Sequence, residues 1–203
     1  MKVKKGDKMK NKKRDTKSID DRPMNVVLFI ARNKDNKHFE HHSERRHAFI
    51  TKEPMDSGYL MQKFNQFVQE GLSGEVSRFY YSVNDRDEEA VYKELLRFLI
   101  DNPDFNLCTL NSKLARFAAM NTCAKTKRWM FDFDIDDSES VNKFCKDIKK
   151  SDGTLIVKSY KTPNGYAVVV NHGFDTRELM KTWPENVTLK RDDLLCYTWS
   201  TKL

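Results

Sequence analysis

Three aspartates at alternate positions carry the clearest chemical signal in the sequence. Residues 129–137 read WMFDFDIDD, in which apolar residues separate Asp132, Asp134 and Asp136. Alternate residues of a β-strand share one face, so these carboxylates would lie together, about 7 Å from one to the next. Grouped carboxylates repel one another unless a cation lies among them, and their oxygens suit Mg²⁺ or Mn²⁺. The pattern predicts a metal site of the kind used in phosphoryl transfer.

Two ordinary roles for these acids stay open. Basic side chains just before the strand can neutralise a solvated acidic face; these are Lys125, Lys127 and Arg128. Asp136 can instead cap the following helix, with Glu139 three residues later as the capping-box partner. Metal binding is therefore expected first of Asp132 and Asp134, and second of Asp136.

A glycine turn lies about 25 residues further along the chain. Asn164-Gly165, within SYKTPNGYAVVV, is a strong signal for a two-residue hairpin turn. Lysines beside such a turn can receive a triphosphate, or they can protect an exposed strand edge. The phosphate-binding residues expected here are Lys158, Ser159, Lys161, Asn164 and Gly165.

An arginine opens the earlier segment SRFYYSVN, residues 77–84, which is predicted to be a strand. Arg78 and Tyr80 share one of its faces, and an arginine in this place can clamp a phosphate bidentately. It can equally form an ion pair with Glu75 or Asp85. Both interpretations of Arg78 stay open.

A histidine-rich segment precedes this strand. Residues 34–47 are polar and are expected to form a loop that contacts nucleic acid. Zinc binding is the less favoured interpretation, because zinc needs about four ligands held by ordered elements. The candidate ligands are His38, Glu40, His41, His42 and His47.

The positive charge is confined to one end of the chain. The 203 residues carry a net charge of +7, with 37 Lys or Arg and 30 Asp or Glu. Residues 1–17 hold nine basic and two acidic residues, 9 − 2 = +7, so the remainder is neutral. We expect a disordered basic tail over residues 1–23 that binds single-stranded nucleic acid by counterion release. A solvated leader that aids solubility is the alternative.

Several protein classes are disfavoured by the sequence. No run approaches the roughly 18–20 apolar residues of a membrane span, and the N-terminus lacks the apolar segment of a secretory signal. The cysteines lack zinc-like or pairing spacing, which indicates reduced thiols in a cytoplasmic protein; they are Cys108, Cys123, Cys145 and Cys196.

Residues 24–203 are predicted to form a single α+β domain, in which helices pack on a mixed or antiparallel sheet. The hairpin requires at least one antiparallel strand pair. Strands are expected over residues 25–31, 77–84, 128–136, 154–160, 165–171 and 194–199. Helices are expected over residues 56–71, 87–100, 111–122 and 138–149, with a short one near 175–180.

The arginine strand, the aspartate strand, the glycine hairpin and a late acid follow one another along the chain. In this order they resemble the catalytic core of the archaeo-eukaryotic primase and primase-polymerase superfamily, over roughly residues 77–199. The resemblance implies an RRM-related core in which Asp132 and Asp134 hold Mg²⁺ or Mn²⁺. It also implies a third acid, Asp192 or Asp193, and a phosphate contact from Arg78. The chain is also similar to small bacteriophage proteins, which would place it in the host cytoplasm, in DNA replication.

One position departs from the family pattern. Ala167 stands where a histidine that contacts nucleotide phosphate is expected, and alanine can neither donate a hydrogen bond nor carry charge. His172, five residues from Ala167, would face the other side of a strand. The resemblance thus implies a nucleotidyltransferase acting on nucleotides and single-stranded nucleic acid, impaired by Ala167. The alternatives are an inactive module that binds nucleic acid, nucleotide or a host protein, and a small metal-dependent nuclease.

Deleting residues 1–17 is expected to flatten the salt dependence of binding to single-stranded nucleic acid. Each Lys or Arg that neutralises a phosphate contributes about 0.7 to the slope of log affinity against log salt concentration. Fluorescence anisotropy at a series of salt concentrations measures this slope. An unchanged slope would show that the tail does not contact the strand.

Overall fold

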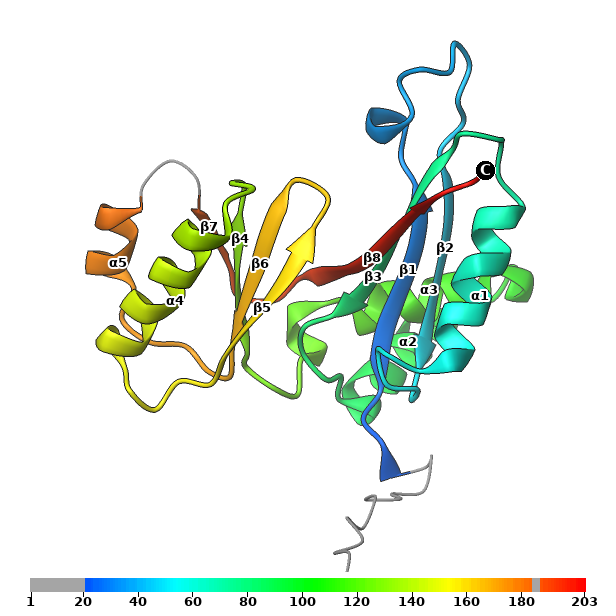
Figure 1. The fold of residues 1–203 in the computed structure, drawn as a ribbon. Coiled ribbons are helices and arrows are strands. Elements are labelled where there is room, and N and C mark those ends of the chain that lie inside the picture. The colour runs from blue at the N-terminus through cyan, green and yellow to red at the C-terminus, as the bar shows by residue number, and fades with distance from the viewer. Residues whose placement is uncertain (1–20, 184–186) are drawn as a thin grey trace, which may run out of the picture.

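The computed structural model describes residues 21–183 and 187–203, which fold into two four-stranded antiparallel sheets with helices packed on them (Figure 1). The predicted α+β class is confirmed. The expectation of one sheet is wrong, because the strands divide between two. Residues 1–20 lie outside the described part of the chain, and with them nearly all of the predicted basic tail.

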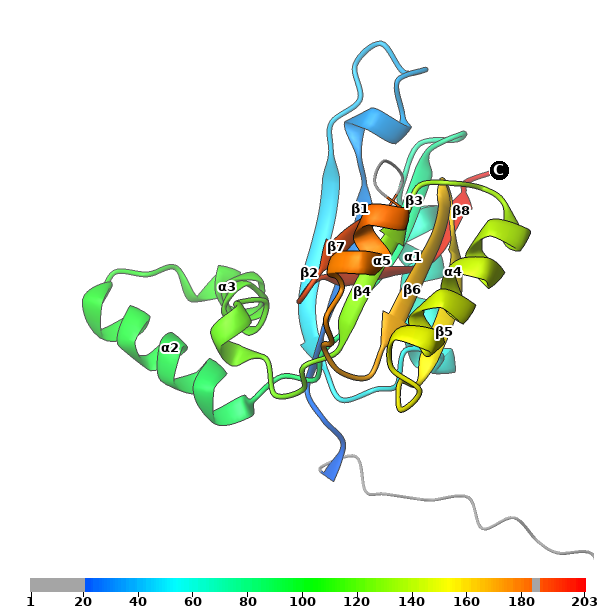
Figure 2. The same ribbon diagram turned by 90° about the vertical axis from the view of Figure 1, so that its left-hand side faces the viewer.

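The first sheet is built from both ends of the chain. Its strand order is β2 (Arg45–Thr51), β1 (Asn25–Ala31), β3 (Val76–Ser82) and β8 (Leu194–Thr201). One face is covered by α1 (Gly58–Gln69), where Phe29, Phe64 and Phe79 form a buried core. The chain between β3 and the second sheet forms α2 (Glu88–Asp101) and α3 (Leu110–Ala118), which extend from the side of this sheet (Figure 2).

The second sheet comes from one continuous segment. In chain order it runs β4 (Trp129–Phe133), α4 (Ser138–Ser151), β5 (Val157–Thr162), β6 (Gly165–Val170), α5 (Arg177–Thr182) and β7 (Val187–Lys190). The strand order is β5-β6-β4-β7, so β6 lies between β4 and β5 and is antiparallel to both. This β-α-β-β-α-β arrangement is the ferredoxin-like split β-α-β motif.

Alternation along β4 gives the second sheet two different faces. Phe131 and Phe133 pack against Phe144 of α4 in a fully buried core. Figure 1 shows α4 and α5 on the side of this sheet that points away from the first sheet. The opposite face meets the first sheet, where Met130 and Ala167 pack in a second buried cluster. The predicted apolar face of β4 is confirmed. Of the predicted acidic face, only Asp132 lies within the strand, where it shares its side with buried Met130.

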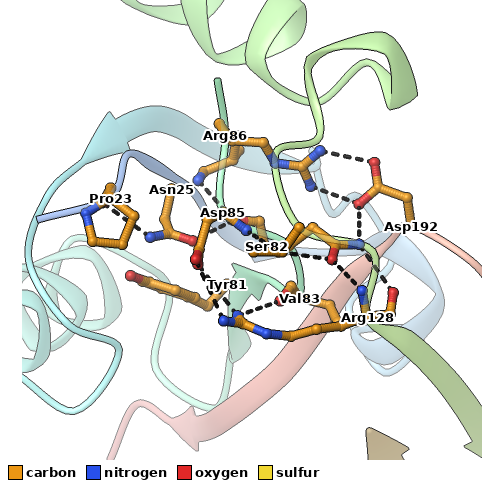
Figure 3. A network of polar contacts seen from close by, with 12 residues as sticks. Pro23, Asn25, Tyr81, Ser82, Val83, Asp85, Arg86, Arg128 and Asp192 are labelled. Carbon is orange, nitrogen blue, oxygen red and sulfur yellow. Dashed lines mark hydrogen bonds and ion pairs between the residues drawn. The ribbon is translucent and has the colours of Figure 1, made fainter. Parts of the chain in front are cut away.

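The chain passes between the two sheets twice, and a buried polar network joins the two passages (Figure 3). Arg86, just after β3, donates hydrogen bonds of 2.8 and 3.0 Å to the two carboxylate oxygens of Asp192, just before β8. The Asn84 side chain donates to Asp192 at 3.0 Å and to the Arg128 carbonyl at 3.1 Å. It also accepts from the Arg128 amide at 2.7 Å and the Thr126 hydroxyl at 2.9 Å.

Several predicted boundaries need correction. Residues 45–47 were expected in a loop but begin β2, and β7 was not predicted at all. Polar residues in β2 and β7 obscure the alternation that would predict a strand. The two strands form because β2 pairs with β1 and β7 pairs with β4. Strand β4 ends at Phe133, three residues before the expected end. None of the helices within residues 21–183 and 187–203 is long and apolar enough to cross a membrane.

Replacing Arg86 with methionine should lower the free energy of unfolding by about 3–5 kcal/mol, because Asp192 would remain buried without its partner. Chemical denaturation of the single variant and of Arg86→Met/Asp192→Asn measures the effect. The double variant should lose less than the sum of the two single losses. Lys93→Met, which removes the exposed Lys93–Glu89 pair on α2, is the control and should change stability by less than about 1 kcal/mol. A loss in Arg86→Met no larger than in this control would contradict a structural role for the pair.

Candidate metal and phosphate site

A cavity of about 430 Å³ lies between the two sheets. The second sheet and the turn before β8 contribute carboxylates to its wall, and the first sheet contributes basic side chains. The acids are Asp132, Asp134 and Asp193, and the bases on the first-sheet side are Arg32, Lys34 and Arg78. One further base, Lys190 at the end of β7, lies on the acidic wall. Charges of both signs from distant parts of the chain therefore meet in one place.

Strand β4 supplies two of the acids. Asp132 lies on the face of β4 toward the first sheet, and Asp134 follows directly after the last residue of the strand. Asp134 is exposed, and it makes no hydrogen bond or ion pair with any residue that the structure describes. A carboxylate with both oxygens accessible is available to a cation.

The glycine hairpin holds the segment that carries Asp134. A Cβ atom at Gly165 would overlap the carbonyl oxygen of Phe133 and lie 3.0 Å from the backbone nitrogen of Ile135. Only glycine lets the hairpin approach the end of β4 this closely. Asn164 lines the cavity beside this contact. The hairpin itself was predicted, and its packing on β4 explains why the turn residue is glycine.

Lys190, at the end of β7, lies between two of the acids. Its ammonium is 2.9 Å from a carboxylate oxygen of Asp132 and 3.2 Å from one of Asp193. Burial disfavours the charged form, but the hydrogen bonds and negative charges of the two aspartates outweigh it and raise the pKa of Lys190. Lys190 could not be identified as a site residue from sequence, because β7 has no clear strand pattern.

The basic wall is organised around another aspartate. Asp35 accepts hydrogen bonds from Arg78 at 2.6 Å and from Arg32 at 2.8 Å. Burial opposes ionisation, but these two guanidinium groups hold the pKa of Asp35 below its usual value. Arg78 therefore pairs with neither Glu75 nor Asp85, the two partners proposed from sequence. Its buried Nε has no hydrogen-bond partner among the described residues.

Ala167 lies in the cavity beside Asp132, directly across the β4–β6 pairing. Opposite residues in an antiparallel pair have neighbouring side chains on the same face. A histidine at this position, as the family pattern expects, would therefore face the cavity. Ala167 is 2% exposed and packs in the cluster between the sheets, so the small side chain is also part of the core.

Other predicted phosphate-binding residues lie away from this cavity. Lys158 lines a different cavity, and Ser159 is exposed on the edge strand β5. Lys161 forms an ion pair with Asp136 and lies over the ring of Tyr166, on the opposite face of the sheet from Ala167. Lys161 points to the side of the sheet away from the cavity. Lys158 shares the face of Tyr160, but it pairs with Val169 rather than with Ala167 and lines the other cavity.

Of the remaining predicted acids, one lines the cavity and two do not. Asp192 is held in the buried pair with Arg86, whereas its neighbour Asp193 lines the cavity. Asp136 lies outside the cavity and does not cap α4. That cap is Asp137, whose carboxylate accepts from the backbone amides of Glu139 at 3.2 Å and Ser140 at 2.8 Å. The capping interpretation of Asp136 is thus wrong by one residue.

The histidine-rich loop makes structural contacts. His42 has hydrogen-bond contacts of 2.9 Å with Asn33 and 3.2 Å with Glu75, and His38 contacts the Gly74 carbonyl. His47 lies in β2. These contacts pack the loop against the start of β3.

The donor chemistry of the cavity fits a divalent cation, although its geometry is not assembled for one. Three carboxylates on one wall are the hard oxygen ligands that Mg²⁺ and Mn²⁺ prefer. Across residues 21–183 and 187–203, however, no three His, Cys, Asp or Glu side chains are grouped closely enough to hold a metal ion. Lys190 would have to leave Asp132 and Asp193 before a metal could bind both.

Comparison with protein-family models, with curated proteins and with solved structures gives no match to this chain.

Replacing Lys190 with methionine should tighten Mn²⁺ binding at least about tenfold, because it removes the cation that now neutralises Asp132 and Asp193. Electron paramagnetic resonance of free Mn²⁺ measures the affinity directly. Lys161→Met, which frees Asp136 outside the cavity, is the matched control and should leave the affinity unchanged. Equal Mn²⁺ affinities in the parent and Lys190→Met proteins would refute competition between Lys190 and the metal.

Proposed function

We propose that the chain is a metal-dependent nucleotidyltransferase of the primase-polymerase type that acts on nucleoside triphosphates and single-stranded nucleic acid. The observation that carries the proposal is the division of charge in the cavity between the sheets. Three carboxylates line one wall, with Lys190 among them, and Arg32, Lys34 and Arg78 line the other. A triphosphate with its divalent cation requires both kinds of group.

The arrangement of the second sheet supports a primase-like core. Its β-α-β-β-α-β order and antiparallel strands are those of an RRM-related unit. The paired acids lie at the end of the first strand of that unit, as the resemblance of the motif requires. Asp193, in the turn that leads into β8, lines the same cavity and would supply the late acid.

Each group in the cavity has a role in the proposal. Asp132, Asp134 and Asp193 would hold Mg²⁺ or Mn²⁺, which when bound neutralises charge developing on the transferred phosphate. Lys34 is exposed at the cavity and contacts no acid within the described residues, so its ammonium is available to phosphate oxygens. Arg78 presents an unpartnered Nε, and Asp35 fixes its orientation.

A catalytically inactive nucleotide- or nucleic-acid-binding module is the second candidate. Two observations favour it. Lys190 neutralises two of the acids, Asp132 and Asp193. Ala167 provides no phosphate contact at the position beside Asp132. The two candidates share the cavity and its ligand, and they differ in whether metal displaces Lys190.

Incorporation of labelled nucleotides on a single-stranded template, primed and unprimed and with Mn²⁺, tests the proposal. We expect activity in the unmodified protein and a loss of at least about hundredfold in Asp132→Asn/Asp134→Asn. Asp104→Asn, an exposed acid far from the cavity in sequence, is the control and should keep full activity. Ala167→His should increase the activity.

The alternative outcomes are distinct. If no folded variant incorporates nucleotide but triphosphate is still bound, the chain is a binding module and not an enzyme. Activity in Ala167→His alone would mean a metal site that lacks its phosphate contact. Shortening rather than extension of the labelled strand would identify a nuclease.

A further inference from the structure

A second cavity, of about 560 Å³, opens at the junction of the two sheets and is not used by the proposed chemistry. We call it the junction groove. One wall consists of residues around the end of β3 and before β1, several of which appear in Figure 3. The other wall consists of residues of β5 and β6. The basic and large apolar side chains of its lining include Arg22, Lys52, Arg128, Ile156, Lys158 and Tyr160.

Strand β5 gives the groove an aromatic and apolar wall. Tyr160 is half-buried, and Ile156, which immediately precedes the strand, is 61% exposed. A flat ring beside exposed aliphatic surface is suited to stacking of unpaired bases, which is largely independent of sequence. A duplex hides its base faces, so this wall favours a single strand.

Four cationic side chains and one acid, Asp85, line the groove. Arg128 pairs with Asp85 at 3.2 Å, and Arg22 pairs with Glu53 at 3.6 Å. Lys158, in contrast, is exposed and contacts no acid that the structure describes. Its charge is therefore available to a backbone phosphate, and it lies two residues from Tyr160 on the same face of β5.

The groove lies where the basic N-terminal segment joins the described structure. Arg22 and Pro23 belong to its lining, and the first 17 residues carry nine Lys or Arg. A phosphate backbone held in the groove could thus also meet the strongest concentration of positive charge in the sequence.

The junction groove also lies close to the candidate catalytic cavity. Ala167 lines the cavity and Val169 lines the groove, two residues apart on one face of β6. Residues at this spacing are about 7 Å apart. Tyr160 of the groove is the cross-strand partner of Ala167.

We propose that the junction groove binds single-stranded nucleic acid, with Tyr160 stacking on a base and Lys158 contacting a phosphate. The identification of this strand as the template rests on the proposed function; the binding itself does not.

Fluorescence anisotropy of a labelled single-stranded oligonucleotide of about 20 nucleotides tests the groove with the full chain. Lys158→Glu and Tyr160→Leu should each weaken binding about tenfold. Lys158→Glu should also lower the salt slope by about 0.7 or more, whereas Tyr160→Leu should leave it unchanged. The matched control is Lys146→Glu on α4, an exposed lysine on the other side of the sheet, which should change affinity less than twofold. Melting curves verify that each variant is folded.

The outcomes separate this inference from the proposed function. If Lys158→Glu and Lys146→Glu change the affinity for the single strand equally, or if a duplex binds equally tightly, the groove is not the binding site. Neither result bears on nucleotide incorporation. Conversely, groove-dependent binding by a protein that incorporates no nucleotide would support the groove and reject the enzyme.

Discussion

The buried ion pair between Arg86 and Asp192 is the constraint on which the arrangement of the two sheets depends. It joins the passage that leaves the first sheet to the passage that returns to it, and Asn84 ties both to the start of β4. A charge left unpaired in this buried place would be costly, so the two residues hold each other in position. The faces of the sheets are thereby fixed close together, and the space that remains at their margin is the candidate site.

The same junction explains the different environments of two neighbouring acids. Asp192 turns into the polar network, and Asp193 consequently turns toward the cavity, where it contacts Lys190. The buried ion pair of Asp192 thus fixes the position of Asp193, the next residue in the chain. The first sheet acts in a similar way, since Asp35 holds Arg78 at the wall opposite the acids. The exposed carboxylate of Asp134 takes part in none of the ion pairs of the described residues, and the Nε of Arg78 is buried there without a hydrogen-bond partner.

Lys190 neutralises the acidic wall of the cavity. Two carboxylates that face a partly buried cavity repel each other, and an ammonium between them removes that repulsion. The arrangement is compatible with a metal that displaces the lysine and with a binding module that never takes one up. Ala167 is compatible with both functions. Its small side chain beside Asp132 packs between the sheets, but it cannot contact a phosphate.

Local pattern was sufficient for much of the fold. Alternation in WMFDFDIDD gave the two faces of β4, Asn164-Gly165 gave the hairpin, and Asp87 and Ser57 cap helices close to their predicted starts. Such features depend on neighbours within a few residues, so the sequence by itself determined them. Tertiary structure alone decided that there are two sheets, that Lys190 meets Asp132, and that Asp193 rather than Asp192 faces the cavity. These contacts join residues far apart along the chain, and they are set by which strand edges and sheet faces pack together, which no local periodicity encodes.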